Sequence, residues 1–156
     1  MDLKSIYENI LNERTKLKKN KRKINGKLED GINPSCGDII QVEIKLDEKK
    51  EKIEDIAFSG EGCAISEASA DIMCDILRGQ NKEDAIEICI LFIQMILEDE
   101  ENIEENEFGI DERYEKLGDA YALKALRYVP ARIKCVLLSW NTAKKALEEM
   151  EKWWKY

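Results

Sequence analysis

The segment IIQVEIKLDEKKEKIEDIAFSG, residues 39–60, decides the fold, because its apolar and polar residues alternate with a period of two. This period is typical of a β-strand with one buried face. Residues 47–50 are polar and predict a turn, and residues 53–59 predict a second strand with Ile56 and Phe58 on its inner side. A connection this short makes the two strands antiparallel neighbours. The apolar residues that share one face of the first strand are Ile40, Val42, Ile44 and Leu46.

The stretches on either side of this hairpin predict a helix, a loop and a tight connection. Residues 3–11 carry apolar side chains at the spacing of one stripe of an amphipathic helix. Residues 31–37 hold two glycines and a proline, the densest such cluster in the chain, which indicates a loop. After the second strand, residues 60–63 predict a tight connection, with a short third strand within it as an alternative.

The rest of the chain has helical periodicity. Apolar stripes predict helices over residues 65–77, 82–97 and 112–127. Pro130 suits the first turn of a final helix, because proline presets the backbone and lacks an amide hydrogen that this turn does not use. A small antiparallel sheet of about three strands with helices packed on one side makes an α+β fold. We expect residues 1–156 to form a single domain.

The balance of charge and apolar length excludes several functions. The chain has 33 acidic and 25 basic side chains, a net charge of −8, which argues against general nucleic-acid binding. Its main basic run, residues 16–23, is interpreted either as a solvated helix end or as a patch that docks a partner. The charged N-terminus lacks the apolar run of a signal peptide, and the apolar stretch 86–97 is too short to span a membrane. We therefore expect a cytoplasmic protein without membrane contact.

The five cysteines, an odd number, favour metal or sulfur chemistry over disulfides in a reducing compartment. Cys36 lies in the predicted loop, Cys63 between strand and helix, and Cys135 early in the last helix. Such positions offer side chains to solvent or to a metal, although three unrelated buried thiols are an alternative. Cys74 and Cys89 fall inside apolar helical segments, where packed and inert thiols are expected.

Three thiolates suit zinc or the irons of an iron–sulfur cluster. A structural zinc ion has four ligands, and the chain contains no histidine to supply the fourth. Asp38, two residues after Cys36, offers a carboxylate from the same loop; alternatively, it caps the turn into the first strand. The cysteine spacings differ from those of a zinc finger. The residues alone therefore predict a metal site without naming a reaction.

Three motifs are similar to the ligand motifs of a known family. They are NPSCGD at residues 33–38, FSGEGCAIS at residues 58–66 and PARIKCVLLSW at residues 130–140. In this order they resemble the SufU/IscU scaffold family of iron–sulfur cluster assembly, which includes the N-terminal domain of NifU. Lys134 stands where IscU-type members carry a histidine, and the long separation of Cys63 from Cys135 implies the helical insertion of the SufU type. The insertion falls around residues 80–128 and is partly acidic.

The resemblance implies a zinc-dependent acceptor of persulfide sulfur that activates a SufS-type cysteine desulfurase, a sulfurtransferase-like role rather than small-molecule catalysis. Cys36 is the expected acceptor, because the proline and glycine around it let its loop swing. Cys135 is the second candidate, and the neighbouring charges of Arg132 and Lys134 predict a stabilised thiolate there. The zinc ligands that the resemblance implies are Cys36, Asp38, Cys63 and Cys135.

Two alternatives stay open. In the first, Cys36, Cys63 and Cys135 bind a transient [2Fe–2S] cluster, which is assembled on this scaffold and passed to downstream iron–sulfur apoproteins or other Suf components. In the second, the zinc ion is purely structural and the domain only mediates interactions. Iron content and visible absorption separate the first alternative from the zinc-dependent acceptor, and sulfur transfer separates the second.

Overall fold

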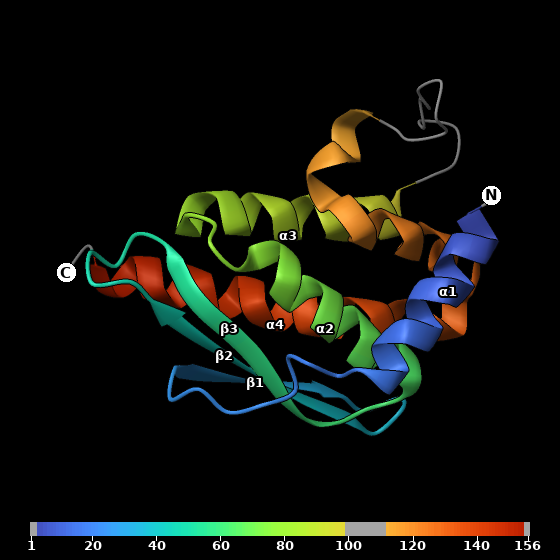
Figure 1. Cartoon of the computed structure of the whole chain (residues 1–156), viewed down its shortest axis with the longest axis horizontal. Helices are drawn as coiled ribbons and strands as arrows, with labels where there is room; N and C mark the ends of the chain where they lie inside the picture. Colours follow the sequence, from blue (N-terminus) through green and yellow to red (C-terminus); the bar gives the residue numbers. More distant parts are fainter. Residues whose placement is uncertain (1–2, 99–111, 155–156) are drawn as a thin grey trace.

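A three-stranded antiparallel sheet in the order β1-β2-β3 forms one side of the molecule, and the helices lie on one face of it (Figure 1). The computed structural model describes residues 3–98 and 112–154. The strands are β1 (Lys27–Asn33), β2 (Asp38–Leu46) and β3 (Ile53–Glu61). The helices are α1 (Leu3–Lys16), α2 (Ala64–Leu77), α3 (Lys82–Leu97), the 3₁₀ helix η2 (Glu112–Tyr128) and α4 (Pro130–Trp154). The predicted α+β class is confirmed.

The predicted hairpin is present as β2 and β3. Its apolar cross-strand pairs are Val42–Phe58 and Ile44–Ile56, and all four side chains are buried. The third strand differs from the prediction. Residues 60–61 end β3 rather than forming a strand of their own, and β1 precedes the hairpin, in the stretch whose glycines and proline indicate a loop.

Gly31 lies in β1 for a reason of packing. A Cβ atom at Gly31 would collide with the Thr142 hydroxyl of α4 and would come within 3.3 Å of the Ile40 carbonyl oxygen. Glycine in a strand often marks such a close approach of another element. Gly31 therefore lets α4 lie directly on β1, and the loop prediction was wrong for residues 31–33. The turn itself is confined to residues 34–37.

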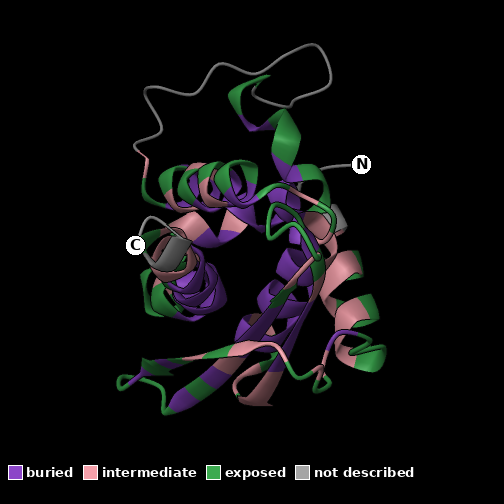
Figure 2. Ribbon diagram, turned by 90° about the vertical axis from the view of Figure 1, so that its left-hand side faces the viewer, coloured by how far each residue is buried: buried purple, intermediate pink, exposed green. Residues whose placement is uncertain are grey.

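The helices form two layers on the inner face of the sheet. α2 and α4 pack directly against the strands, whereas α3 and η2 pack on the other side of α4 (Figure 1). α1 packs against α2 and η2. Figure 2 shows the strands alternating between buried and exposed residues and the buried side of α4 turned inward. Within the described residues, no helix is long and apolar enough to cross a membrane.

A set of buried contacts holds α4 in register with α2 and α3. The Trp140 ring of α4 stacks on the Phe92 ring of α3, with ring centroids 4.0 Å apart. The Trp140 indole N–H donates to the Ser69 hydroxyl of α2 at 2.9 Å, and this hydroxyl donates to the Val136 carbonyl at 2.7 Å. Each of these polar groups thereby has a partner despite its burial. Because Val136 directly follows Cys135, these bonds fix the position at which α4 presents Cys135.

The basic run at residues 16–23 is tied to neighbouring elements. Its ion pairs with carboxylates of α2 and β3 are Lys18–Glu67, Lys19–Asp75, Lys21–Glu67 and Arg22–Asp55. Burial alone would raise the pKa of Asp75, but hydrogen bonds from Arg14 and Asn20, among others, lower it to about 2. Most basic residues of the run are therefore paired with carboxylates of α2 and β3, while most of the run stays exposed at the surface.

The predicted insertion around residues 80–128 contains α3 and η2. Residues 112–127 are helical, as predicted, but they form a 3₁₀ helix that Gly118 interrupts, with φ 50° and ψ −129°. The acidic part of the insertion falls mainly on residues 99–111, which lie outside the described residues. That this stretch is an insertion within a single domain of residues 1–156 stays a prediction.

Candidate metal centre

The turn between β1 and β2 presents Cys36 to solvent. The backbone amides of Cys36 and Gly37 donate to the Asn33 carbonyl at 3.3 and 2.9 Å, and the Ser35 amide donates to the Asn33 side-chain oxygen at 3.2 Å. Gly37 has a φ of +74°, a left-handed conformation that glycine adopts without steric cost. These bonds fold residues 34–37 into a compact turn and leave the Cys36 side chain exposed at its tip.

Asp38 is the first residue of β2, and its side chain is buried. Its Oδ1 atom accepts a hydrogen bond from the Cys63 backbone amide at 3.0 Å. Its Oδ2 atom is buried and has no hydrogen-bond partner among the described residues. A buried carboxylate oxygen without a partner carries a large desolvation cost, which a cation offsets. One oxygen of Asp38 therefore has a structural role, although it binds the Cys63 amide rather than capping the turn into the first strand, and the other is left for a ligand.

Cys63 occupies the N-cap position of α2, between β3 and the helix. Its sulfur accepts from the Ser66 backbone amide at 3.4 Å and lies 3.5 Å from the Ser66 hydroxyl. The helix N-terminus, which favours negative charge, thus faces the Cys63 sulfur. The bond from its amide to Asp38 places Cys63 at the same end of the sheet as the β1–β2 turn.

Cys135 lies in the second turn of α4 and is fully buried. Its sulfur lies 3.2 Å from the Cys36 sulfur, and the Asn33 side-chain amide approaches it at 3.7 Å. Burial raises the pKa of the Cys135 thiol, and its neighbours Cys36, Cys63 and Asp38 raise it further. Without a metal ion, burial and these neighbours therefore oppose a Cys135 thiolate, and Arg132 and Lys134 are exposed on the surface. A stabilised thiolate at Cys135 stays a prediction for the metal-bound site.

Three of the four predicted ligands converge in the structure. One ligand atom each from Cys36, Asp38 and Cys135 lies within 4.8 Å of the others, so this group could hold a metal ion. Cys63 is not part of the group by this distance, although its amide binds Asp38 directly. Two soft sulfurs and one carboxylate oxygen form a donor set that zinc accepts.

Cys74 and Cys89 are packed in the hydrophobic core, as the sequence predicts. Sequence reasoning missed Asn33, whose side chain both organises the turn and contacts the Cys135 sulfur. Its position directly before Pro34 was the available signal, because an asparagine side chain often hydrogen-bonds the backbone of a turn that it begins. Ser66 was likewise missed as a donor to the Cys63 sulfur.

The fold and the thiol-rich site agree with the comparison to known protein families. The family model described as the NifU-like N terminal domain matches residues 6–117. The chain belongs to this family, which confirms the resemblance of its three motifs. It is 35% identical to the zinc-dependent sulfurtransferase SufU of Bacillus subtilis (strain 168), over 96% of this chain and 95% of that protein.

Further relatives and solved structures agree with this placement. The chain is 41% identical to the iron-sulfur cluster assembly scaffold protein IscU of Streptococcus pyogenes serotype M1, over 74% of this chain and 65% of that protein. A crystal structure of a protein proposed as the iron-sulfur cluster assembly scaffold of the SUF system in Fervidobacterium islandicum AW-1 superposes with a TM-score of 0.77. That protein is 35% identical to this chain, and the match covers 92% of this chain and 97% of the other.

Proposed function

We propose that this chain is an iron–sulfur cluster assembly protein that binds one zinc ion and accepts persulfide sulfur from a SufS-type cysteine desulfurase. The observation that carries the proposal is Asp38: a carboxylate oxygen of this residue lies within 4.8 Å of the sulfurs of Cys36 and Cys135, and its buried Oδ2 atom lacks a partner among the described residues. A site without a bound cation would leave this oxygen uncompensated. The names of relatives in iron–sulfur cluster assembly and zinc-dependent sulfur transfer support the same function.

The residues at the site fit a zinc ion. Cys36, Asp38 and Cys135 would supply three ligand atoms from the turn, the start of β2 and α4. Cys63 is the proposed fourth ligand, because it adjoins Asp38 and contributes to raising the pKa of Cys135. A bound zinc ion would keep the coordinating thiols deprotonated at neutral pH.

Cys36 is the proposed sulfur acceptor, because it is the exposed member of the group. Its thiolate attacks the terminal sulfur of the persulfide on the desulfurase. A sulfur–sulfur bond to Cys36 forms as the sulfur–sulfur bond of the donor breaks, and the donor cysteine leaves as a thiolate. The step needs no external oxidant or reductant, because the transferred sulfur keeps its oxidation state. Cys135 is fully buried, which favours it as a lasting ligand. It is therefore only the second candidate for the sulfur acceptor.

The proposed partners are the desulfurase and, after sulfur transfer, the Suf components or apoproteins that receive sulfur. The cytoplasm is the proposed location, because its reducing conditions keep the five free thiols available. Neither nucleic acid nor membrane is a proposed partner, given the net charge of −8.

Two measurements test the proposal together. Elemental analysis of protein kept reduced throughout is expected to give about one zinc per chain, the stoichiometry of a single four-ligand site. Alanine production by a cysteine desulfurase is expected to rise with this protein, to lose that rise with Cys36→Ser, and to keep it with Cys89→Ser as the matched control. Protein without metal, or equal rates for the two variants, would overturn it.

The scaffold alternative makes a different prediction for the same sample. Anaerobic purification from iron-replete cells would then give coloured protein with iron, inorganic sulfide and visible absorption. A colourless protein that contains zinc supports the acceptor function. A purely structural zinc ion predicts that chelation unfolds the protein and that no sulfur is transferred.

A further inference from the structure

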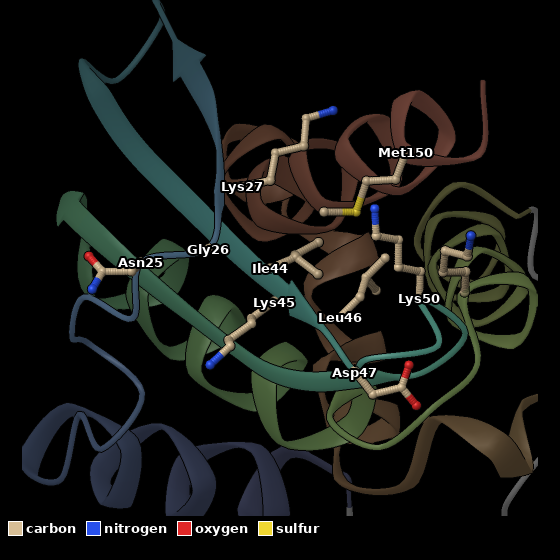
Figure 3. Close-up of a pocket in the computed structure, with 10 residues that line it drawn as sticks. Asn25, Gly26, Lys27, Ile44, Lys45, Leu46, Asp47, Lys50 and Met150 are labelled. Carbon is tan, nitrogen blue, oxygen red and sulfur yellow. The ribbon is translucent and has the colours of Figure 1, made fainter. Parts of the chain in front are cut away.

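A cavity of about 640 Å³ opens at the far end of β2, between the sheet, the β2–β3 turn and α4 (Figure 3). Asp38 and Leu46 are the first and last residues of this nine-residue strand, so the candidate metal centre and the cavity lie roughly 26 Å apart. Small-molecule sites typically measure about 300–1,000 Å³. The cavity is therefore large enough for a small molecule, and it has no part in the sulfur chemistry proposed above.

One side of this cavity is apolar. Figure 3 shows the side chains of Ile44, Leu46 and Met150 pointing toward one another in its middle. Ile44 belongs to the buried core, and Leu46 and Met150 are half-buried and pack against that core. The wall is thus anchored on β2 and α4. A ligand body that covers the exposed parts of Leu46 and Met150 removes apolar surface from water.

The remaining lining is strongly cationic. The cavity is lined by the lysines Lys27, Lys45, Lys50 and Lys82 and by one carboxylate, Asp47. Asp47 is engaged within its own turn, because its Oδ1 atom accepts from the amides of Glu51 and Lys52 at 3.0 and 3.3 Å. In a chain with a net charge of −8, such a concentration of lysines around an apolar wall favours an anion.

Lys50 is the lysine best placed to receive this anion. Lys27 forms an ion pair with Glu149 at 3.2 Å, and Lys45 pairs with Glu54 at 3.4 Å. Lys50 is exposed and forms no ion pair among the described residues, and Figure 3 shows it extending toward Met150. A ligand anion therefore meets Lys50 without breaking an existing pair.

We propose that this cavity binds a small organic anion with an apolar body, of which an aliphatic carboxylate is the simplest representative. The body lies against Leu46 and Met150, and the charged group binds Lys50. This arrangement matches the composition of typical ligand sites, in which an apolar surface supplies contact and a few polar groups orient the ligand. The proposal is independent of zinc and of sulfur transfer.

Three probes of matched design test the chemistry by NMR titration of the isotope-labelled full chain. Decanoate carries both the apolar body and the anion, acetate carries the anion alone, and decyltrimethylammonium carries a similar body with the opposite charge. Decanoate is expected to shift the amide signals of Gly26, Ile44 and Lys50 and to leave those of the Cys36 turn unchanged. Acetate and decyltrimethylammonium are expected to bind there at least about tenfold more weakly, a difference of about 1.4 kcal/mol.

Two variants and a control locate the site. Lys50→Glu is expected to weaken decanoate binding about five- to tenfold, and Met150→Gln several-fold. Lys23→Glu makes the same change of charge at another exposed lysine without an ion pair among the described residues, and it is expected to leave binding unchanged. Equal effects of the two lysine variants, equal binding of the two charged amphiphiles, or no shifts at the cavity would each overturn the proposal. Thermal melting confirms that each variant is folded.

Discussion

The cysteines of this protein occupy two environments that burial alone does not distinguish. Cys135 is as completely buried as Cys74 and Cys89. Cys74 and Cys89 belong to the continuous hydrophobic core, and burial raises the pKa of Cys89 to about 12. Cys135 lies outside that core cluster, and its sulfur is 3.2 Å from the exposed Cys36 sulfur and within reach of Asp38.

The difference shows that the neighbours of a buried thiol, rather than its depth, decide what it can do. A thiol surrounded by apolar side chains has no group to stabilise its thiolate, so it stays protonated and inert. A thiol beside a second sulfur and a buried carboxylate lacks only a cation to become a ligand. The two environments should therefore differ in thiol reactivity, in zinc affinity and in their contribution to stability.

Reactivity toward iodoacetamide should give the largest difference between a thiol of the candidate site and a thiol of the core. In metal-free protein, Cys36 is exposed and should be alkylated directly, whereas Cys89 must first be released by opening of the core. For a stability of about 5 kcal/mol, opening limits the Cys89 rate by a factor on the order of 10³ or more. Mass spectrometry of peptides over time measures both rates. In guanidinium the rates should converge, and fast modification of Cys89 in native protein would remove the distinction.

Zinc affinity should separate Cys135 from Cys89, although both are fully buried. Cys135→Ser should weaken zinc binding by more than about 100-fold, because changes to groups behind the ligands already cost about 10–100-fold. Cys89→Ser should leave affinity unchanged. Competition with a chromogenic chelator gives both values. Equal zinc affinity in the two variants would show that Cys135 is a core thiol after all.

The fold could be predicted from sequence where periodicity carries the signal. The alternation around Ile44 identified β2 and β3 because each strand has one buried face. β1 was missed because Gly31 signals a loop in the sequence, whereas in the fold it makes room for Thr142 of α4. A contact between residues so far apart in the chain leaves no local pattern. The kink at Gly118 in η2 was also not predicted.

The candidate site was predictable in its members but not in its geometry. Loop and helix-start positions distinguished Cys36, Cys63 and Cys135 from the two core thiols, and the structure brings Cys36 and Cys135 into contact. The unequal roles of the two Asp38 oxygens depend on the register between β2 and the start of α2, which spacing does not reveal. The ligand set itself stays a prediction.

The stability of the core should respond to substitution of Cys74 and Cys89, the two thiols that are expected to have no effect on zinc binding. Cys74→Ser and Cys89→Ser place a hydroxyl in apolar surroundings, which should lower the free energy of unfolding by about 1–3 kcal/mol. Zinc content should be unchanged, because both residues lie within the core cluster. Urea unfolding measures the loss, and Cys89→Ala, which adds no hydroxyl, serves as the control. A loss of zinc in either serine variant would contradict the assignment of the ligands.

Asp38 should give the smallest effect and the sharpest test, because its two oxygens have different partners. Asp38→Asn keeps an oxygen that can accept from the Cys63 amide but replaces the second carboxylate oxygen with an amide group. This change should weaken zinc binding about tenfold, or about 1.4 kcal/mol, and leave the melting temperature of the metal-free protein nearly unchanged. Asp38→Ala removes both oxygens, so it should weaken zinc binding and also loosen the connection to Cys63.

Replacing Asp38 with a stronger ligand should raise the zinc affinity instead of lowering it. A carboxylate is a harder ligand than a thiolate for a borderline ion such as zinc, so it leaves the site easier to open. Asp38→Cys should therefore bind zinc more tightly than the wild type and transfer sulfur more slowly, because Cys36 is released less often. Chelator competition gives the order of affinities, and a desulfurase-coupled assay gives the transfer rates. If Asp38→Asn holds zinc as tightly as the wild type, the second oxygen is not a ligand and Asp38 serves only to fix Cys63.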